Sequence, residues 1–319
     1  MNIVIIGAGG IGGYLASMLG AFHGRHHAHE AHEAHGSSRR LHCVARGTHG
    51  RHIQRHGLTL THEGTEARAD RRCRALTASP SMPSFHPDIV LFCVKMTDYE
   101  SACALLRALK RPTLVLPLQN GVEVTSLLTR DVPHHRIGMG VAHISSFVKE
   151  AGVICLNGNL ARFSFAVSDK KDEALLDAFI AYGKEASIQC RQVPKDVMAR
   201  MLWDKFIFLT TFSGLTTLTQ QPLGVLRSHP PTWRLFEEGL DEGERVARAY
   251  GISFPESPKV TWMKTASSLP ASYRASMSLD RERGRPLELP WLSGGLARLA
   301  EKKTIPVPIH RMITALLSL

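Results

Sequence analysis

In the first half of the chain, short runs of apolar residues alternate with stretches in which apolar residues recur every three or four positions. The short runs predict buried strands of a parallel sheet, and the periodic stretches predict the helices that connect them. The predicted strands are Asn2–Ile6, Leu41–Ala45, Asp88–Val94, Thr113–Pro117, Arg136–Ile144 and Phe163–Val167, and a helix is predicted over Glu173–Glu185. This alternation is typical of an α/β fold.

The pattern changes near Val193–Pro194, after which apolar residues follow helical spacing to the end of the chain. We therefore expect an α/β domain over residues 1–193 and an all-helical domain over residues 194–319. A length of 319 residues is typical of two domains.

The first predicted strand runs directly into a glycine-rich turn with GxGxxG spacing, and helical spacing of apolar residues follows it. The turn consists of Gly7, Ala8, Gly9, Gly10, Ile11 and Gly12. In this strand–turn–helix context, Gly7 permits the tight turn, Gly9 lets the backbone approach a pyrophosphate, and Gly12 allows close helix–strand packing. The helix N-terminus then attracts the phosphates, so the motif predicts dinucleotide binding in a Rossmann domain. The alternative is a glycine-rich turn without a ligand.

Three further residues follow predicted strands, where parallel sheets face their ligands. Arg46 ends the second strand, at a place where an acidic residue would favour NAD(H). An arginine there favours the 2′-phosphate of NADPH, unless it is an ordinary surface residue. Lys95 and Asn120 follow the next two strands and are site candidates by topology, with ordinary turn chemistry as the alternative.

Lys205 is the clearest chemical anomaly of the second half. It lies inside an apolar stripe of the predicted helix that contains Met198, Leu202, Leu209 and Phe212. Burial of a lysine is costly and lowers its pKa, so a lysine in such a stripe indicates a functional role. The alternative is a side chain whose charged end reaches the surface.

The amino-acid composition limits the classes of binding partner that we expect. The net charge is +11, and nine arginines lie between residues 36 and 87, but no aromatic residues interleave with them and no DNA-binding motif spacing occurs. A solvated basic face or a site for an anionic small molecule is therefore favoured over nucleic acid. The six cysteines are scattered without a CxxC pair, which is typical of reduced thiols in the cytoplasm. Neither a membrane span nor a signal peptide is expected.

Six histidines crowd the segment His23–His35. Metal chelation by neighbouring helical turns is one interpretation. The other is a solvated low-complexity insertion between a helix and a strand, and the composition favours it. We therefore expect no functional metal.

Taken together, ordered motifs along nearly the whole chain resemble those of the 2-dehydropantoate 2-reductase (ketopantoate reductase) family. They are GAGGIGG, VARG, CVK (93–95), PLQNGV (117–122), LWDKF (202–206) and ASMSLDRERGRPLEL (275–289). The resemblance implies an N-terminal Rossmann domain, a helical C-terminal domain and a site in the cleft between them. It also implies NADPH-dependent reduction of a small 2-keto acid, ketopantoate, to pantoate, a step of pantothenate and coenzyme A biosynthesis. The oligomeric state stays open, with a homodimer as one outcome.

The resemblance also implies roles for residues of this chain. Lys205 matches the lysine that protonates the forming alkoxide, and Glu288 matches a carboxylate that helps hold the substrate. The other matches are Ser276 for the substrate carboxylate, Asp280 beside it, Asn120 near the nicotinamide and Lys95 after its strand. Pocket-lining asparagines of well-known members are replaced here by Leu209, Ser213 and Tyr273, and Ser213 is taken as a substrate residue.

Two alternatives to ketopantoate reduction stay open. The first is a reductase of a different branched 2-keto acid, because a leucine cannot replace an amide that binds a substrate hydroxyl. The second is a non-catalytic NADP(H)-binding sensor or metal-handling protein whose histidine tract is the active feature. The presence of both Lys205 and Glu288 argues against the second.

Overall fold

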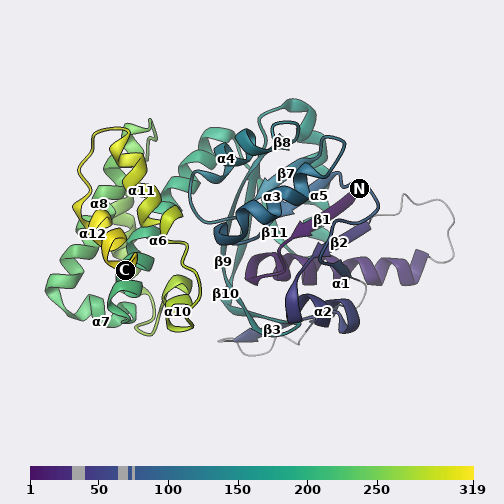
Figure 1. The fold of residues 1–319 in the computed structure, drawn as a ribbon, viewed down its shortest axis with the longest axis horizontal. Helices are drawn as coiled ribbons and strands as arrows, with labels where there is room; N and C mark the ends of the chain where they lie inside the picture. Colours follow the sequence, from purple (N-terminus) through teal and green to yellow (C-terminus); the bar gives the residue numbers. More distant parts are fainter. Residues whose placement is uncertain (31–39, 64–70, 74–75) are drawn as a thin grey trace. The chain divides into compact units, whose positions relative to one another are not determined.

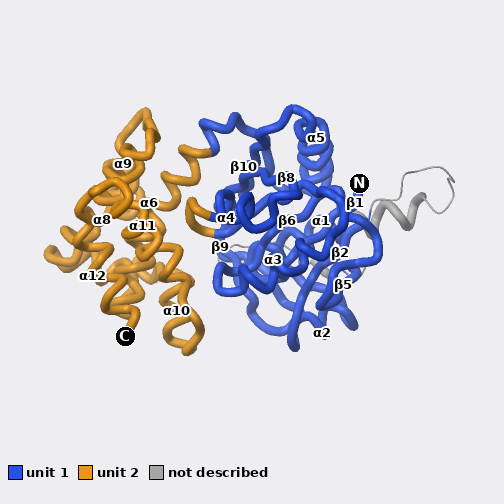
Figure 2. Tube along the Cα trace, turned by 45° about the horizontal axis from the view of Figure 1, so that its top comes forward, with its two compact units in different colours: residues 1–119, 124–198 blue, residues 120–123, 199–319 orange. Residues whose placement is uncertain are grey.

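The computed structural model describes residues 1–30, 40–63, 71–73 and 76–319, and for residues 23–30 and 71–72 it describes the backbone only. It divides the chain into two compact units, residues 1–119 with 124–198 and residues 120–123 with 199–319 (Figure 2). The units part inside one helix, after Met198, a few residues beyond the predicted boundary at Val193–Pro194.

Unit 1 contains a six-stranded parallel sheet in the order β5-β2-β1-β6-β7-β8. Its strands β1, β2, β7 and β8 are labelled in Figure 1. The strands are β1 (Asn2–Ile6), β2 (Arg40–Val44), β5 (Thr77–Ser79), β6 (Ile89–Phe92), β7 (Leu114–Pro117) and β8 (Arg136–Ile137). The central strands are buried along nearly their whole length, which explains their continuous apolar sequences. The α/β prediction is confirmed.

A second sheet of five strands was not predicted. It runs β11-β10-β3-β4, with β9 paired to β10. Its strands are β3 (Leu58–Glu63), β4 (Arg71–Cys73), β9 (Met139–Glu150), β10 (Val153–Ala166) and β11 (Gln189–Gln192). The prediction of one strand over Arg136–Ile144 is wrong, because the chain leaves the first sheet at Gly138 and continues in the second sheet as β9. The predicted strand Phe163–Val167 is the end of the longer β10.

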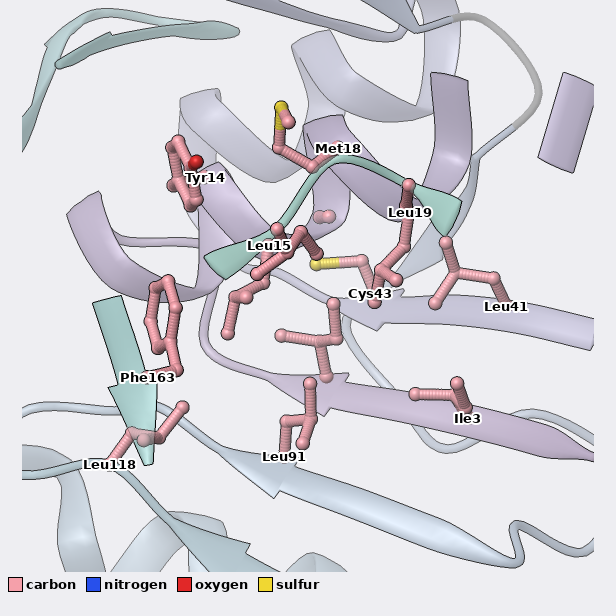
Figure 3. Packing of buried hydrophobic residues seen from close by; sticks show 14 of the residues in the cluster. Ile3, Tyr14, Leu15, Met18, Leu19, Leu41, Cys43, Leu91, Leu118 and Phe163 are labelled. Carbon is pink, nitrogen blue, oxygen red and sulfur yellow. The ribbon is translucent and has the colours of Figure 1, made fainter. Parts of the chain in front are cut away.

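Helix α1 (Gly10–Glu30) packs against strands of both sheets, β1 and β2 of the first and β3, β4, β9 and β10 of the second. Its residues Leu15 and Leu19 meet Leu41 and Cys43 of β2 in a buried cluster (Figure 3). On another side, the ring of Tyr14 stacks on Phe163 of β10 with centroids 5.9 Å apart. The glycine turn at the start of α1 is therefore fixed from both sheets.

The remaining elements of unit 1 are α2 (Gly47–His56), the 3₁₀ turn η1 (Met96–Asp98), α3 (Tyr99–Arg107), α4 (Val124–Asp131) and α5 (Lys170–Glu185). Helix α5 contains the predicted helix Glu173–Glu185 and begins one turn earlier, where Asp169 caps it by accepting a hydrogen bond from the Lys171 amide.

Unit 2 is helical throughout its described length, as predicted. Its elements are α6 (Lys195–Thr219), α7 (Leu223–Ser228), α8 (Pro230–Ala249), α9 (Pro258–Ser268), α10 (Ser276–Glu282), η2 (Leu289–Trp291), α11 (Ser293–Glu301) and α12 (Pro308–Leu317).

Helix α6 is the central element of unit 2, and most residues from Phe206 to Thr217 are buried on every side. Its buried threonines satisfy their hydroxyls by donating to carbonyls one turn earlier, as Thr216 does to Phe212 at 2.7 Å. Gly239 and Gly243 of α8 lie against α6, where an added Cβ would press on Thr211 and Ile207. Close packing of this kind holds Lys205 in a fixed place on α6.

Candidate active site

The glycine turn of unit 1 has the geometry that a dinucleotide requires. Gly7 has a φ of +99°, a left-handed conformation that favours glycine. A Cβ on Gly12 would overlap the carbonyl oxygen of Gly7, so the close approach of helix and strand depends on glycine there. A Cβ on Gly9 would meet no atom of the described residues within 4 Å. Gly9 thus faces open space beside the N-terminus of α1, which fits a pyrophosphate.

The other residues of the turn support this arrangement. Ala8 is buried, Gly10 begins α1, and Ile11 is partly buried against the core. A Cβ on Gly10 would overlap the carbonyl of Ser146 in β9. The second sheet therefore lies directly against the turn, a contact that the sequence motif does not reveal.

His49 of α2 also holds the turn, and sequence analysis did not identify it. Its Nε2 lies 2.9 Å from the carbonyl oxygen of Ala8, and its Nδ1 accepts the amide N–H of Gly152 at 3.0 Å. This pattern corresponds to a neutral ring with the proton on Nε2. Burial lowers the pKa of His49, which favours that neutral form. His49 thereby ties the glycine turn to the β9–β10 connection.

Arg46 does follow β2, but it has an acidic neighbour that the linear sequence conceals. Its guanidinium Nη2 lies 2.8 Å from Oδ1 of Asp98, and Nη1 donates to Oγ of Ser101 at 3.3 Å. Asp98 ends η1, the turn that follows β6, and Lys95 is the exposed residue preceding that turn. The structure thus places Arg46 at the carboxyl end of β2, and Lys95 and Asp98 beyond the carboxyl end of β6, with β1 between these two strands of the first sheet.

In unit 2, Lys205 lies on α6 beside the carboxylate of Glu288, which precedes η2. Lys205 is partly buried and Glu288 is buried. Desolvation lowers the pKa of Lys205 to about 8, and the charge of Glu288 opposes this by raising it. A lysine with such a pKa can donate its proton effectively near neutral pH.

The adjacent Asp204 has a different partner. Its backbone and side-chain oxygens accept hydrogen bonds from the indole of Trp262 at 3.0 and 3.1 Å, and that ring stacks on Phe208 with centroids 4.3 Å apart. Asp204 therefore anchors α9 to α6, while the carboxylate acting on Lys205 comes from Glu288.

The other predicted substrate and cofactor residues of unit 2 differ in exposure. Ser276 is exposed at the start of α10, whereas Asp280 is buried with Arg285 3.9 Å away. Asn120 is partly buried before Gly121. Ser213 is buried two turns beyond Lys205.

None of the three positions that depart from the family pattern offers a side-chain amide. The hydroxyl of Ser213 donates to the carbonyl of Leu209 at 2.5 Å, so its proton is used within α6. Tyr273 stacks on Phe212 with ring centroids 5.1 Å apart, and burial raises its pKa. Leu209, one turn beyond Lys205, is apolar. The face of α6 that carries Leu209 and Ser213 is therefore less polar than it would be with asparagines at these positions.

The described part of the chain shows neither a metal cluster nor a membrane-spanning helix. Among the described residues, no group of three or more His, Cys, Asp or Glu side chains is placed to hold a metal ion, and the side chains of the tract His23–His35 lie outside those residues. Within the same part of the chain, no helix is long and apolar enough to cross a membrane.

Comparison with known proteins covers both units. Residues 3–169 match the family described as ketopantoate reductase PanE/ApbA, and residues 197–319 match its C-terminal domain. A protein named 2-dehydropantoate 2-reductase from Halobacterium salinarum is 29% identical over 236 residues, 73% of this chain and 75% of that protein. One of the same name from Mesorhizobium japonicum is 27% identical, covering 99% of this chain and 96% of the relative.

Among solved structures, a PanE/ApbA family ketopantoate reductase from Ralstonia eutropha JMP134 has the same fold. It superposes with a TM-score of 0.82 at 27% sequence identity, covering all of this chain and 97% of that one.

Proposed function

Because this chain belongs to the ketopantoate reductase PanE/ApbA family, we propose that it reduces 2-dehydropantoate (ketopantoate) to pantoate with NADPH as hydride donor, in pantothenate biosynthesis. The observation that carries the proposal is the pair formed by Lys205, with its pKa lowered to about 8, and the buried Glu288. The open glycine turn of unit 1 supports dinucleotide binding. The names of the relatives support the substrate.

Bound NADPH supplies a hydride to the carbonyl carbon of the 2-keto acid. As the carbonyl oxygen gains negative charge, the ammonium of Lys205 stabilises that charge and donates a proton to it. Desolvation brings the pKa of this ammonium from its ordinary value of 10.5 to about 8, so it gives up its proton more readily. The dense packing of α6 fixes the backbone that carries the lysine, which limits the reorganisation needed during reaction.

Glu288 has two roles in this proposal. Its charge offsets part of the desolvation and keeps Lys205 protonated, and its carboxylate helps hold the substrate. Around this pair we assign Ser276 to the substrate carboxylate, with Asp280 and Ser213 as further substrate residues. The turn Gly7–Gly12, Arg46, Lys95 and Asn120 bind the cofactor.

Replacing Glu288 with glutamine will move the pH dependence of reduction to lower pH. Lys205 must be protonated to act as the acid, so kcat/KM for the keto acid falls as pH rises past its pKa, about 8. Removing the Glu288 charge removes the influence that raises this pKa, so the fall occurs at lower pH, and KM for the keto acid rises. The pH profile of kcat/KM, measured for both enzymes, checks this. An unchanged profile in Glu288→Gln would remove Glu288 from the mechanism.

Replacing Arg46 with alanine will raise KM for NADPH at least tenfold more than KM for NADH. A charge-assisted contact with phosphate contributes roughly 1.5–3 kcal/mol, and only NADPH carries the 2′-phosphate. Steady-state kinetics with both cofactors measures the difference. Equal use of NADPH and NADH by the unmutated enzyme would contradict the proposed contact.

A different branched 2-keto acid is the second candidate, and a specific observation favours it. Leu209 is apolar and the Ser213 hydroxyl donates within its own helix, so neither residue presents an amide to a substrate hydroxyl. This candidate predicts that keto acids lacking the hydroxyl of ketopantoate are reduced with equal or higher kcat/KM.

A further inference from the structure

We propose that Asp98 sets the balance between NADPH and NADH, because it competes with the cofactor 2′-phosphate for the guanidinium of Arg46. The inference rests on the proposed contact between Arg46 and that phosphate. Asp98 follows a different strand from Arg46, and it is not part of the glycine motif.

The two side chains meet at the ligand-facing edge of the first sheet. Arg46 follows β2 and precedes α2, whereas Asp98 follows β6 at the end of η1, and β1 lies between those strands. The strand β1 leads into the glycine turn, so the pair spans the edge from which the turn begins. Ligands of open α/β sheets bind at this carboxyl edge.

The ion pair is held in place yet open to solvent. The separation between Arg46 Nη2 and Asp98 Oδ1 is 2.8 Å, and the side chains are 55% and 51% exposed. Ser101 fixes the arrangement from α3, since its hydroxyl accepts from Arg46 and donates to the Asp98 carbonyl at 2.9 Å. A ligand can therefore reach the guanidinium, but it finds a carboxylate already bound there.

The charge of Asp98 acts in opposite directions on the two cofactors. A 2′-phosphate on Arg46 would bring a group of nearly two negative charges close to the carboxylate, and the repulsion weakens NADPH binding. The free 2′-hydroxyl of NADH has a proton to donate, and a carboxylate at this edge is the acceptor that dinucleotide sites use for it. Arg46 therefore favours NADPH, while Asp98 reduces that preference.

The test replaces Asp98 with asparagine, which keeps the size of the side chain and removes its charge. Titration of the full-length protein with NADPH and with NADH, followed by nicotinamide fluorescence, gives the two dissociation constants. We expect NADPH to bind roughly five- to tenfold more tightly, as estimated for a charge and a dianion about 6 Å apart in water. NADH should bind equally or more weakly.

Glu100→Gln is the matched control. Glu100 lies two residues away on α3 and is exposed, but it pairs with Arg107 at 2.7 Å rather than with Arg46. Removing its charge should leave the ratio of the two dissociation constants unchanged. An equal shift in Glu100→Gln and Asp98→Asn would mean a general charge effect and would overturn the role of Asp98.

Arg46→Ala separates the failure of this inference from the failure of the proposed function. If Arg46→Ala leaves NADPH affinity unchanged, the phosphate contact itself is wrong and the inference falls with it. If Arg46→Ala weakens NADPH binding but Asp98→Asn leaves the ratio unchanged, only the competition is refuted. Weaker NADPH binding by Asp98→Asn also refutes it, since Asp98 would then hold Arg46 in place for the phosphate.

Discussion

Replacing Lys205 with alanine is expected to lower kcat for keto acid reduction by about 10²–10⁴, the range for a positioned proton donor. The ammonium of Lys205 lies in a desolvated setting beside the buried carboxylate of Glu288. Without it, the forming alkoxide would depend on water for its proton and on weaker dipoles for its stabilisation. Steady-state kinetics at saturating cofactor and keto acid measures the loss.

Cofactor affinity is the control for this variant. The glycine turn that we assign to NADPH belongs to unit 1, so the dissociation constant for NADPH should change little in Lys205→Ala. Lys205→Met keeps most of the side-chain volume and should lose as much kcat as Lys205→Ala, which separates the lost proton donor from lost packing. If either variant keeps near-normal kcat, Lys205 is structural and another group donates the proton.

Alanine at Gly9 is expected to reduce affinity for the dinucleotide more than tenfold while leaving the thermal stability of the protein unchanged. A Cβ on Gly9 meets no atom within 4 Å in the part of the chain that the structure describes, so the free protein accommodates it. The same Cβ would occupy the space through which the backbone approaches a pyrophosphate. Loss of one hydrogen bond to a charged group contributes roughly 1.5–3 kcal/mol, which is tenfold or more in affinity.

Gly12→Ala provides the contrast. Its Cβ would overlap the carbonyl of Gly7, so helix and strand must separate, and overpacking of this kind costs about 1–3 kcal/mol of stability. We expect a lower Tm for Gly12→Ala and an unchanged Tm for Gly9→Ala. Equal losses of Tm in the two variants would show that Gly9 has a packing role, and unchanged dinucleotide affinity in Gly9→Ala would contradict its place in the cofactor site.

The features predicted correctly from the sequence are those that adjacent residues determine. The glycine turn follows its strand without a gap, and the strands β1, β6 and β7 are apolar along their length because both faces are covered. Helical spacing places Lys205 within an apolar stripe, and the structure shows the desolvated setting that this stripe predicts, while its catalytic role stays a prediction. In each case, local periodicity carries the information.

The second sheet was missed because its strands lack such a signal. In β10 the burial alternates irregularly, with polar residues and Gly158 in the middle of the strand, and its register against β9 shifts between Leu156 and Ala161. The stretch Arg136–Ile144 reads as one strand, and nothing local shows that its halves belong to different sheets. Pairing between distant segments decides this structure.

The partners of the candidate site were missed for a similar reason. Asp98 lies 52 residues from Arg46, and His49 lies 41 residues from Ala8, so folding alone brings each pair together. Neither partner belongs to a short motif. Sequence analysis found residues that carry an unusual pattern but not the residues that hold or oppose them.

Reduction of ketopantoate and of its analogue without the hydroxyl, 3,3-dimethyl-2-oxobutanoate, tests the central claim most directly. The two keto acids differ by a single hydroxyl group, and loss of NADPH absorbance reports both reactions. We predict that the purified protein oxidises NADPH with both and with a higher kcat/KM for ketopantoate. An equal or higher kcat/KM for the analogue would contradict ketopantoate as the substrate, and no oxidation of NADPH with either would contradict the assignment as a reductase of branched 2-keto acids.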